Sequence, residues 1–425
     1  MRIDRLELKN FKGFAERTLE FGPRFNLLVG ENGSGKSSIL EAVVIGLEEW
    51  LIPFDAASGR GFDENLVRIT RLESEGGLRF ERSDPAYVDA TGSVSGGPFH
   101  ARWLPWNVRG HDQVLFGIAN DQQVSLDKPV TLPIPIYYAA NRLSHPASSR
   151  TDPFETKADL SRAKAYVGCA DGYLNPDHLI AWFKREELIR LQTGKNGGPL
   201  DIARKAILNC LEGGVDLQYS VQDLDLLVHF ERNGWQPFAN LSDGQKSIVA
   251  MVGEIAYRCA WLNPHLGNRV LEETPGVVLI DELDLHLHPR WQRRVIDDLK
   301  RTFPAMQFIC TTHSPFLIQS LEPGELIQLD PEKEALEYSQ RSIEDIVETI
   351  QGVEMPQRGR RREQMEEAAE HYFSLLRQKD KVAAADLDSA EADYRKASEA
   401  YTDQPAIHAL LKLERLFADH EIKPD

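Results

Sequence analysis

Hydrophobic and polar residues alternate at the start of the chain, which predicts strands. Residues 3–8 read Ile-Asp-Arg-Leu-Glu-Leu, and after a break at Lys12-Gly13 the same habit returns around residues 21–29. A period of two is typical of a strand with one buried face. The run Phe25-Asn-Leu-Leu-Val29 is almost continuously apolar, as expected of a strand buried on both faces. We predict two or three strands here, followed by a glycine-rich loop and a helix over residues 38–47.

The middle of the chain changes its pattern twice. Residues 66–140 are rich in turn residues and aromatic residues and read as strands, ending in an apolar run at 132–138. From 151 to 213 the apolar residues recur at helical spacing, for example over 179–191. A strand-like pattern returns at residue 217.

The last part of the chain predicts alternating helices and strands. Residues 247–262 read as an apolar helix, and residues 277–280 and 307–310 read as buried parallel strands on either side of a helix near 290–303. Beyond about residue 340 the composition becomes rich in Ala, Glu, Arg and Lys, which indicates a separate group of about three helices. The pattern as a whole predicts an α/β protein with added helices.

Composition excludes several classes of protein. The chain has 425 residues, of which 42% are hydrophobic and 27% charged, as in globular proteins. It contains no apolar run of the roughly 18 to 20 residues that a membrane span needs. Acidic residues stand where a signal peptide needs apolar ones, so we expect a cytoplasmic protein. The net charge of −17 argues against a surface coated with basic residues, although a local basic groove stays compatible with it.

The four cysteines do not indicate a metal site or a disulfide framework. They are scattered along the chain with no C-x-x-C spacing, so we expect reduced packing residues at Cys169, Cys210, Cys259 and Cys310.

The glycine-rich run after residue 29 fits the phosphate-binding pattern G-x-x-x-x-G-K-[ST]. It lies between a buried strand and a helix, the setting in which backbone N–H groups and a helix N-terminus bind phosphate. Lys36 would neutralise the β- and γ-phosphates of ATP, and the Ser37 hydroxyl would hold Mg²⁺. The predicted nucleotide-binding residues of this loop are Gly30, Glu31, Asn32, Gly33, Ser34, Gly35, Lys36, Ser37 and Ser38.

A second acidic motif ends the predicted strand 277–280. Asp281 would join the Mg²⁺ shell, and Glu282 would polarise the water that attacks the γ-phosphate. Because apolar strands that end in acidic residues are common, this motif indicates a function only together with the other motifs.

Two more motifs follow the same order as in a known class of enzyme. Leu241-Ser-Asp-Gly-Gln245 opens a helix, with Ser242 and Asp243 as cap candidates and Gly244 permitting close backbone approach. Thr311-Thr-His313 directly follows the strand 307–310. Taken together with the phosphate loop and the acidic strand (the Walker A and Walker B motifs), these motifs resemble the ABC-type ATPases.

The ABC resemblance assigns roles to these motifs. It implies that Ser242 and Gly244 of the signature motif, with Gln245 beside them, contact the nucleotide held by a second copy, so that ATP lies between two protomers of a homodimer or higher oligomer. It implies that His313 senses the γ-phosphate and that residues 283–289 form the D-loop.

A narrower resemblance is carried by Lys9-Asn-Phe-Lys-Gly-Phe14, by Asn32 and by the run Asp-Glu-x-Asp-x-His-x-His-Pro. These features are similar to the SMC/Rad50/RecF-like branch of compact ABC ATPases, over residues 1–50 and 237–330. Residues 256–267 and 271–276 resemble the stand-alone ATPases that include the Septu anti-phage subunit PtuA, which are also found in some retron operons. That resemblance implies a separate HNH nuclease subunit.

The chain departs from that branch in three ways. Only about 200 residues separate Ser37 from Leu241, without heptads, so no long coiled-coil arm fits. The glutamine of the Q-loop is not evident, because residues 137–142 (Tyr-Tyr-Ala-Ala-Asn-Arg) occupy its place. Asp386 and Asp388 offer the D-x-D of a Toprim nuclease, but they lie in helical text, so we expect a protein that is not itself a nuclease.

Three further patterns leave alternatives open. His286 and His288 could be mistaken for a metal cluster, although a structural role on a short loop is favoured. Aromatic and basic residues interleave at Arg102, Trp103, Trp106 and Arg109, as in single-strand binders or in the core of a small β lobe. The basic run 358–362 would be a solvated linker or a contact with DNA or RNA phosphates.

We therefore predict an α/β ABC-type P-loop ATPase head with a mixed or parallel sheet, an antiparallel β lobe, a helical insertion and a C-terminal helical appendage. Residues 1–150 would form the N-terminal part of the head and 151–236 the insertion. Residues 237–335 would complete the head, and 336–425 would dock a partner. The expected function is an ATPase of an anti-phage complex that regulates an HNH nuclease, and the alternative is a RecF-like DNA-binding clamp.

Overall fold

The computed structural model describes residues 1–58, 62–74, 77–104, 118–120, 129–143, 161–194, 198–329, 341–351, 360–377 and 384–398. It divides into two compact units, residues 1–346 and 347–425. Among the helices that it describes, none combines the length and the apolar character needed to cross a bilayer.

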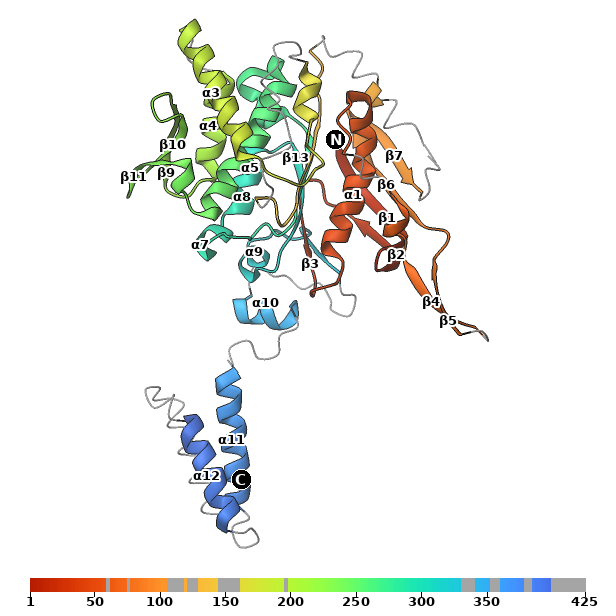
Figure 1. Cartoon of the computed structure of the whole chain (residues 1–425), viewed down its shortest axis with the longest axis vertical. Coiled ribbons are helices and arrows are strands. Elements are labelled where there is room, and N and C mark those ends of the chain that lie inside the picture. The colour runs from red at the N-terminus through yellow and green to blue at the C-terminus, as the bar shows by residue number, and fades with distance from the viewer. Residues whose placement is uncertain are drawn as a thin grey trace. The chain divides into compact units, whose positions relative to one another are not determined.

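A five-stranded parallel sheet forms the centre of the first unit (Figure 1). Its strands, in spatial order, are β14 (Leu326–Gln328), β3 (Phe25–Val29), β13 (Met306–Thr311), β12 (Gly276–Ile280) and β8 (Ile134–Tyr138). Every residue of β3, β8, β12 and β13 is buried, which explains why the sequences of these strands are almost entirely apolar. The predicted parallel pairing of the strands at 277–280 and 307–310 is confirmed.

A second, antiparallel sheet lies on the other side of helix α1 (Lys36–Leu51). Its strands, in spatial order, are β2 (Phe14–Glu20), β1 (Arg2–Phe11), β6 (Tyr87–Val94) and β7 (Gly97–Trp103). Helix α1 contacts β6, β7 and β13, so it packs between the two sheets and is buried on nearly all sides. The opening of the chain thus contains three strands, of which two belong to this sheet.

A buried glutamine also joins the two sheets directly. Gln307 on β13 is 1% exposed, and its side chain exchanges two hydrogen bonds of 2.8 Å with the backbone of Ile3 on β1. Because both ends of the amide are satisfied, this polar group is buried without the cost of an unpaired donor or acceptor.

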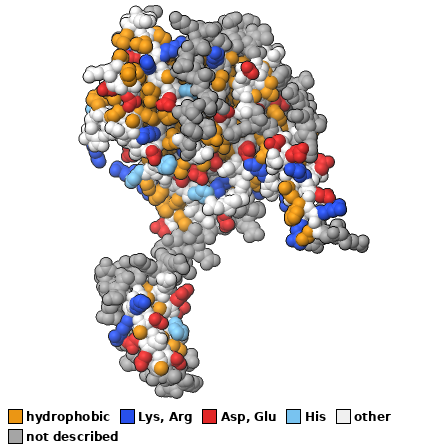
Figure 2. Space-filling model, viewed as in Figure 1, with side chains coloured by type: hydrophobic (Ala, Val, Ile, Leu, Met, Phe, Trp, Pro, Cys, Tyr) orange, Lys and Arg blue, Asp and Glu red, His pale blue; other side chains and the backbone are white. Residues whose placement is uncertain are grey.

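A hairpin of β4 (Ile69–Ser74) and β5 (Gly77–Arg82) extends from the antiparallel lobe (Figure 1). Its residues Ile69, Leu78 and Phe80 are exposed. Figure 2 shows hydrophobic side chains together with Lys or Arg side chains on this hairpin. A short 3₁₀ helix at Glu64–Leu66 lies beside the hairpin, and another at Ile52–Phe54 follows the end of α1, where Phe54 packs against Tyr166.

Helices cover the other face of the parallel sheet. They are α3 (Pro176–Thr193), α4 (Pro199–Cys210), α5 (Asp243–Leu262), α6 (Val270–Glu273), α7 (Pro289–Gln292), α8 (Val295–Thr302) and α9 (Pro315–Gln319), with 3₁₀ helices at Arg162–Tyr166, Phe238–Asn240 and Pro264–Arg269. Helix α5 packs against α3 and α4, and this contact buries the apolar run that the sequence shows at 247–262.

The helix expected near residues 290–303 is two helices, which corrects the prediction. Arg294 leaves helical geometry (φ −125°), and α8 begins after it. The break has a packing reason: the indole of Trp291 on α7 donates to the carbonyl oxygen of Cys210 (2.9 Å), while α8 buries Ile296 and Leu299. Tertiary contacts here override a local helical pattern.

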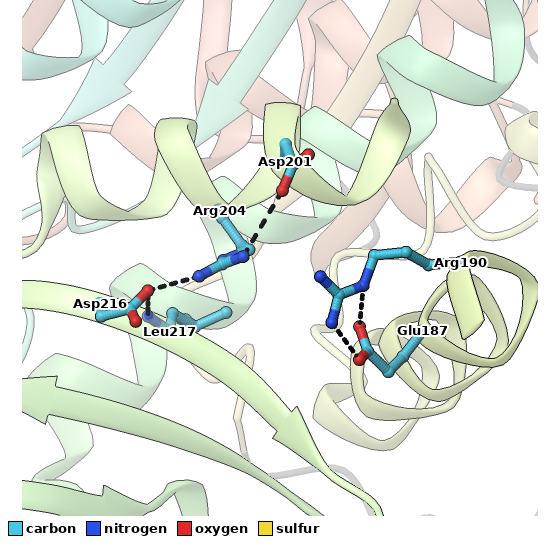
Figure 3. A network of polar contacts seen from close by, with 6 residues as sticks. All are labelled: Glu187, Arg190, Asp201, Arg204, Asp216 and Leu217. Carbon is cyan, nitrogen blue, oxygen red and sulfur yellow. Dashed lines mark hydrogen bonds and ion pairs between the residues drawn. The ribbon is translucent and has the colours of Figure 1, made fainter. Parts of the chain in front are cut away.

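A small antiparallel sheet interrupts the helices, with strands β9 (Gly214–Ser220), β10 (Asp225–Phe230) and β11 (Gly234–Pro237). Arg204 on α4 joins it to the helices through Asp216 of β9 (2.5 Å), and also pairs with Asp201 (3.5 Å) (Figure 3). The carboxylate of Asp216 accepts a further bond from the backbone N–H of Leu217 (2.8 Å). This network connects helix α4 with strand β9.

The second unit has its own apolar core between α11 (Arg360–Leu376) and α12 (Ala384–Ser398). Helix α10 (Ile343–Thr349) spans the boundary between the two units. The core residues are Met365, Ala369, Tyr372, Phe373, Leu376 and Ala390. Asp386 and Asp388 lie within α12, in agreement with the helical pattern of the sequence, and the described element before it is helix α11.

Candidate active site

The glycine-rich loop between β3 and α1 encloses the amine of Lys36. The Nζ atom donates to the carbonyl oxygens of Gly30 (2.8 Å) and Glu31 (2.9 Å), and 7% of the residue is exposed. Gly35 ends the loop with φ 94°, in the left-handed region that favours glycine. A Cβ atom at Gly35 would also lie 2.3 Å from Cζ of Phe14. Both backbone conformation and space therefore require glycine at this point.

The start of α1 fits an anionic group. No side chain caps α1, and its first turn contains no acidic residue, so the N–H groups of that turn face no competing anion of their own helix. The buried hydroxyl of Ser34 has no hydrogen-bond partner among the described residues. An orphaned donor beside an uncapped helix N-terminus is what a phosphate group would satisfy. Ser37 is exposed at the same end of the helix, where its hydroxyl is free to meet a metal ion.

The two acids that follow β12 form a tight, bonded turn, here called the acid turn (Asp281 and Glu282). Asp281 is 5% exposed, and its carboxylate accepts a hydrogen bond from the hydroxyl of Thr311 (2.5 Å). The same hydroxyl oxygen accepts from the backbone N–H of Glu282 (2.8 Å). Glu282 has φ 51°, a conformation uncommon for a residue with a Cβ. Thr311, at the end of β13, therefore contacts both members of the turn.

Strand order brings the phosphate loop and the acid turn to one edge of the sheet. β3 pairs in parallel with β13, and β13 pairs in parallel with β12, so their carboxyl ends meet at the same edge. In open α/β sheets this edge is where ligands bind. Lys36, Asp281 and His313 all follow these strands, and His313 is exposed there.

The D-loop and the segment around His313 are bonded to each other. The hydroxyl of Thr312 donates to the carboxylate of Asp284, and it accepts from the backbone N–H of Ser314 (2.9 Å). The hydroxyl of Ser314 donates to the side-chain oxygen of Gln292 on α7 (2.7 Å). The side-chain nitrogen of Gln292 donates in turn to the carbonyl oxygen of Leu287 (2.8 Å). The loop that carries His313 is thus held to the D-loop by side-chain bonds.

The signature motif begins helix α5 with a reciprocal cap. Ser242 is the N-cap, and it exchanges hydrogen bonds with Gln245, so the side-chain oxygen of Gln245 is already engaged by the cap. Gly244 is packed against its own D-loop: a Cβ atom there would lie 2.4 Å from the carbonyl oxygen of His286. The close approach expected at Gly244 is therefore present, with the D-loop as its neighbour. Ser242 itself is exposed.

Arg142 is a residue of the site to which no sequence motif assigns a role. Arg142 stands in the segment that replaces the expected Q-loop, four residues beyond β8, and is 2% exposed. Its Nη1 donates to the carbonyl oxygen of Asp281 (2.8 Å) and its Nη2 to that of Glu282 (3.3 Å). Burial lowers the pKa of Arg142, and the charges of Asp281 and Glu282 oppose that shift. An arginine just past a fully apolar strand was the available signal, since such a charge needs a buried partner.

Several open alternatives can be placed. His288 caps α7 by accepting from the backbone N–H of Arg290 (3.3 Å), and among the described residues no group of three potential metal ligands occurs. Arg102 pairs with the buried Asp89 on β6 (2.7 Å), in the antiparallel sheet. Trp106 and Arg109 lie outside the described residues, as does Arg358 of the basic run, whose last three arginines open α11.

Sequence comparisons match the chain to a protein family and to several known proteins. A model of the family described as "AAA domain, putative AbiEii toxin, Type IV TA system" matches residues 25–319. The chain is 26% identical over 405 residues to the "Retron Ec83 probable ATPase" of Escherichia coli, covering 76% of this chain and 70% of that protein.

Two further relatives match this chain over less than half of their own length. The "Septu protein PtuA" of Bacillus mycoides (strain KBAB4) is 27% identical over 355 residues, and the match covers 78% of this chain and 41% of that protein. The chain thus spans less than half of that relative. "DNA replication and repair protein RecF" of Brucella abortus (strain 2308) is 31% identical over 151 residues, or 30% of this chain and 37% of that protein.

Proposed function

Because the chain belongs to the AAA-domain family whose model spans residues 25–319 and is an ATPase of the P-loop class, we propose that it is the ATP-hydrolysing subunit of an anti-phage complex. In this proposal its nucleotide state regulates a separate HNH-type nuclease. The observation that carries the catalytic part is the convergence of the phosphate loop and the acid turn on neighbouring parallel strands. The similarity to the retron Ec83 ATPase and to PtuA supports the biological part.

The chain's own residues divide the work of hydrolysis. Lys36 and the first N–H groups of α1 bind and orient the phosphates, and the Ser34 hydroxyl gains the partner that it lacks. Ser37 and Asp281 would hold Mg²⁺, which supplies positive charge against the phosphate oxygens. Glu282 accepts the proton of the attacking water, and His313 contacts the γ-phosphate.

We propose further that ATP binding joins two copies of the chain. Ser242 is exposed at the N-terminus of a 20-residue helix, and among the described residues its side chain hydrogen-bonds only to Gln245 of its own turn. Helix α5, unlike α1, has a side-chain cap and an acid, Asp243, in its first turn, so the contact would come from the exposed Ser242 hydroxyl, which would exchange its bond to Gln245 for one to a phosphate from outside the chain. The signature of one protomer would therefore complete the pocket of the other.

Ser242→Glu is expected to abolish ATP-dependent dimerisation while leaving ATP binding by single protomers within about threefold. The added carboxylate repels the phosphates across the interface, yet it is tolerated at a helix N-terminus. Light scattering or small-angle scattering with saturating ATP, in a Glu282→Gln background, measures the mass. Thr193→Glu, at an exposed position ending α3, is the matched control. A chain that stays monomeric without the Ser242 change, or a variant that dimerises normally, would contradict the ATP sandwich.

We assign the docking of the nuclease to residues 347–425. This unit has its own core between α11 and α12, and helix α10 crosses its boundary with the head, so a deletion that keeps α10 whole begins after residue 351. Removal of residues 352–425 is expected to leave ATP turnover within about twofold and to abolish co-purification with the HNH protein of an adjacent reading frame. Retention of the complex by the shortened chain would refute this assignment, and the absence of an adjacent HNH frame would refute the nuclease partner.

The second candidate function is an ATP-dependent DNA-binding clamp without a nuclease partner. The similarity to RecF of Brucella abortus supports it. In that function the basic run 358–362 would contact nucleic-acid phosphates. Salt-dependent DNA affinity that falls when these four arginines are neutralised favours the clamp, whereas affinity that does not change argues against it.

A further inference from the structure

Arg142 is the one described side chain that bonds to both carbonyl groups of the acid turn and also to the signature helix. We propose that Arg142 is a positioning residue that holds Glu282 in its working orientation and joins the acid turn to helix α5. This inference rests on the proposed function, because it concerns the residue assigned to activate water. Arg142 belongs neither to the phosphate-binding pattern nor to the acidic motif, so the inference adds a new residue to the site.

The guanidinium reaches three different structural elements. Besides the carbonyl oxygens of Asp281 and Glu282, its Nη1 meets the carbonyl oxygen of Ala139 (3.4 Å), in its own loop. Its Nε donates to the hydroxyl of Ser247 on α5 (3.2 Å). The planar group with donors on three nitrogens makes these contacts possible at once, and lysine, with one nitrogen, would have to give up some of them.

The acid turn needs support from outside its own strand. Glu282 lies at φ 51°, which a residue with a Cβ adopts only where its surroundings hold it there. The N–H of Asp281 donates to the carbonyl oxygen of Tyr138 (2.8 Å), and the N–H of Glu282 donates to Thr311. Arg142 supplies donors for the two carbonyl groups, so the turn is bonded on both its donor and its acceptor sides. Loss of the guanidinium would take from the Asp281 carbonyl oxygen its Arg142 donor (2.8 Å) and would leave the Glu282 carbonyl oxygen with the N–H of Leu285 (3.1 Å), so the turn would be held more loosely.

The bond to Ser247 gives the arrangement a second consequence. Ser247 is 2% exposed and lies on α5, the helix whose N-terminus carries Ser242. A shift of α5 when a second copy engages Ser242 would therefore reach the Glu282 carbonyl through one buried side chain. Arg142 thereby connects the element that senses the partner with the group that activates water.

Arg142→Lys is expected to lower kcat at least tenfold while the ATP dissociation constant changes less than threefold. The phosphate loop binds ATP through residues that Arg142 does not contact, so the effect should fall on kcat and not on KM. Steady-state ATPase kinetics and direct nucleotide binding, with thermal unfolding measured for each variant, give both quantities. A kcat within twofold of the unchanged chain would overturn the proposal.

Arg258→Lys is the matched control. Arg258 is also a buried arginine, 4% exposed, and it also donates to backbone carbonyls, including that of Val167 (3.0 Å), but it pairs with Glu254 and touches no residue of the acid turn. The same chemical change there should leave kcat within about twofold. An equal loss of kcat in both variants would mean a general effect of buried arginine and would overturn the specific role.

Ser247→Ala tests the link to α5 and decides the matter if Arg142→Lys does not fold. It removes one hydroxyl and is expected to lower kcat two- to fivefold with unchanged ATP affinity. An unchanged kcat would overturn the link.

Glu282→Gln separates this inference from the proposed function. If the unchanged chain hydrolyses ATP and Glu282→Gln does not, normal kinetics of Arg142→Lys refute the positioning role alone. If the unchanged chain has no ATPase activity, the proposed function itself fails.

Discussion

Glu282→Gln is expected to bind ATP with nearly unchanged affinity and to hydrolyse it at least a hundredfold more slowly. The amide has the size of the carboxylate but cannot accept the proton of the attacking water, and general-base catalysis contributes about 10²- to 10⁴-fold. The backbone of the turn should persist, since Thr311 and Arg142 bond to main-chain atoms of Glu282 and not to its side chain. Binding and chemistry should therefore separate in this variant.

The measurement compares single-turnover hydrolysis with equilibrium ATP binding. Glu273→Gln makes the same substitution on α6, at an exposed pair with Arg269, and should leave both quantities unchanged. Turnover of Glu282→Gln at the rate of the unchanged chain would remove Glu282 from its proposed role. Equal loss of binding and turnover would instead point to a damaged pocket.

Lys36→Ala is expected to weaken ATP binding at least a hundredfold and, through this, to abolish hydrolysis at micromolar ATP. Hydrogen bonds to charged groups are worth about 1.5 to 3 kcal/mol each, and about 2.7 kcal/mol corresponds to a hundredfold in affinity. Lys36 has a second task, because its amine holds the carbonyl oxygens of Gly30 and Glu31. Its removal takes away both the charge and the bonds that shape the loop.

Isothermal titration with ATP tests this expectation, and thermal unfolding shows whether the head is intact. Lys205→Ala removes a lysine from an exposed position of α4 and should not alter affinity. Affinity within threefold of the unchanged chain would show that the loop does not bind the nucleotide through Lys36. That result would undermine the assignment of the pocket, not only of one residue.

Local patterns predicted much of the head correctly. The strand at 25–29, the loop and the helix that follows are adjacent in the chain, so apolar runs and glycine spacing suffice to indicate them. The strands at 277–280 and 307–310 were indicated for the same reason, since burial on both faces leaves a continuous apolar run. The cap at Ser242 was likewise visible, because a capping box spans only three residues. The break between α7 and α8 was missed, because the packing of Trp291 decides it.

The sequence by itself determined which chemical groups this protein carries, and in what order along the chain: a phosphate loop, a capped helix, two acids after a strand and a histidine after the next. Only the tertiary structure decided which of them meet. Arg142 bonds to Asp281 and Ser247 across separations of 139 and 105 residues, and Thr311 reaches Asp281 across 30. Such contacts depend on the order of strands in the sheet, which no periodicity records. An arginine in a loop and a threonine at a strand end become parts of the site only when folding brings the carboxyl ends of β8, β12 and β13 together.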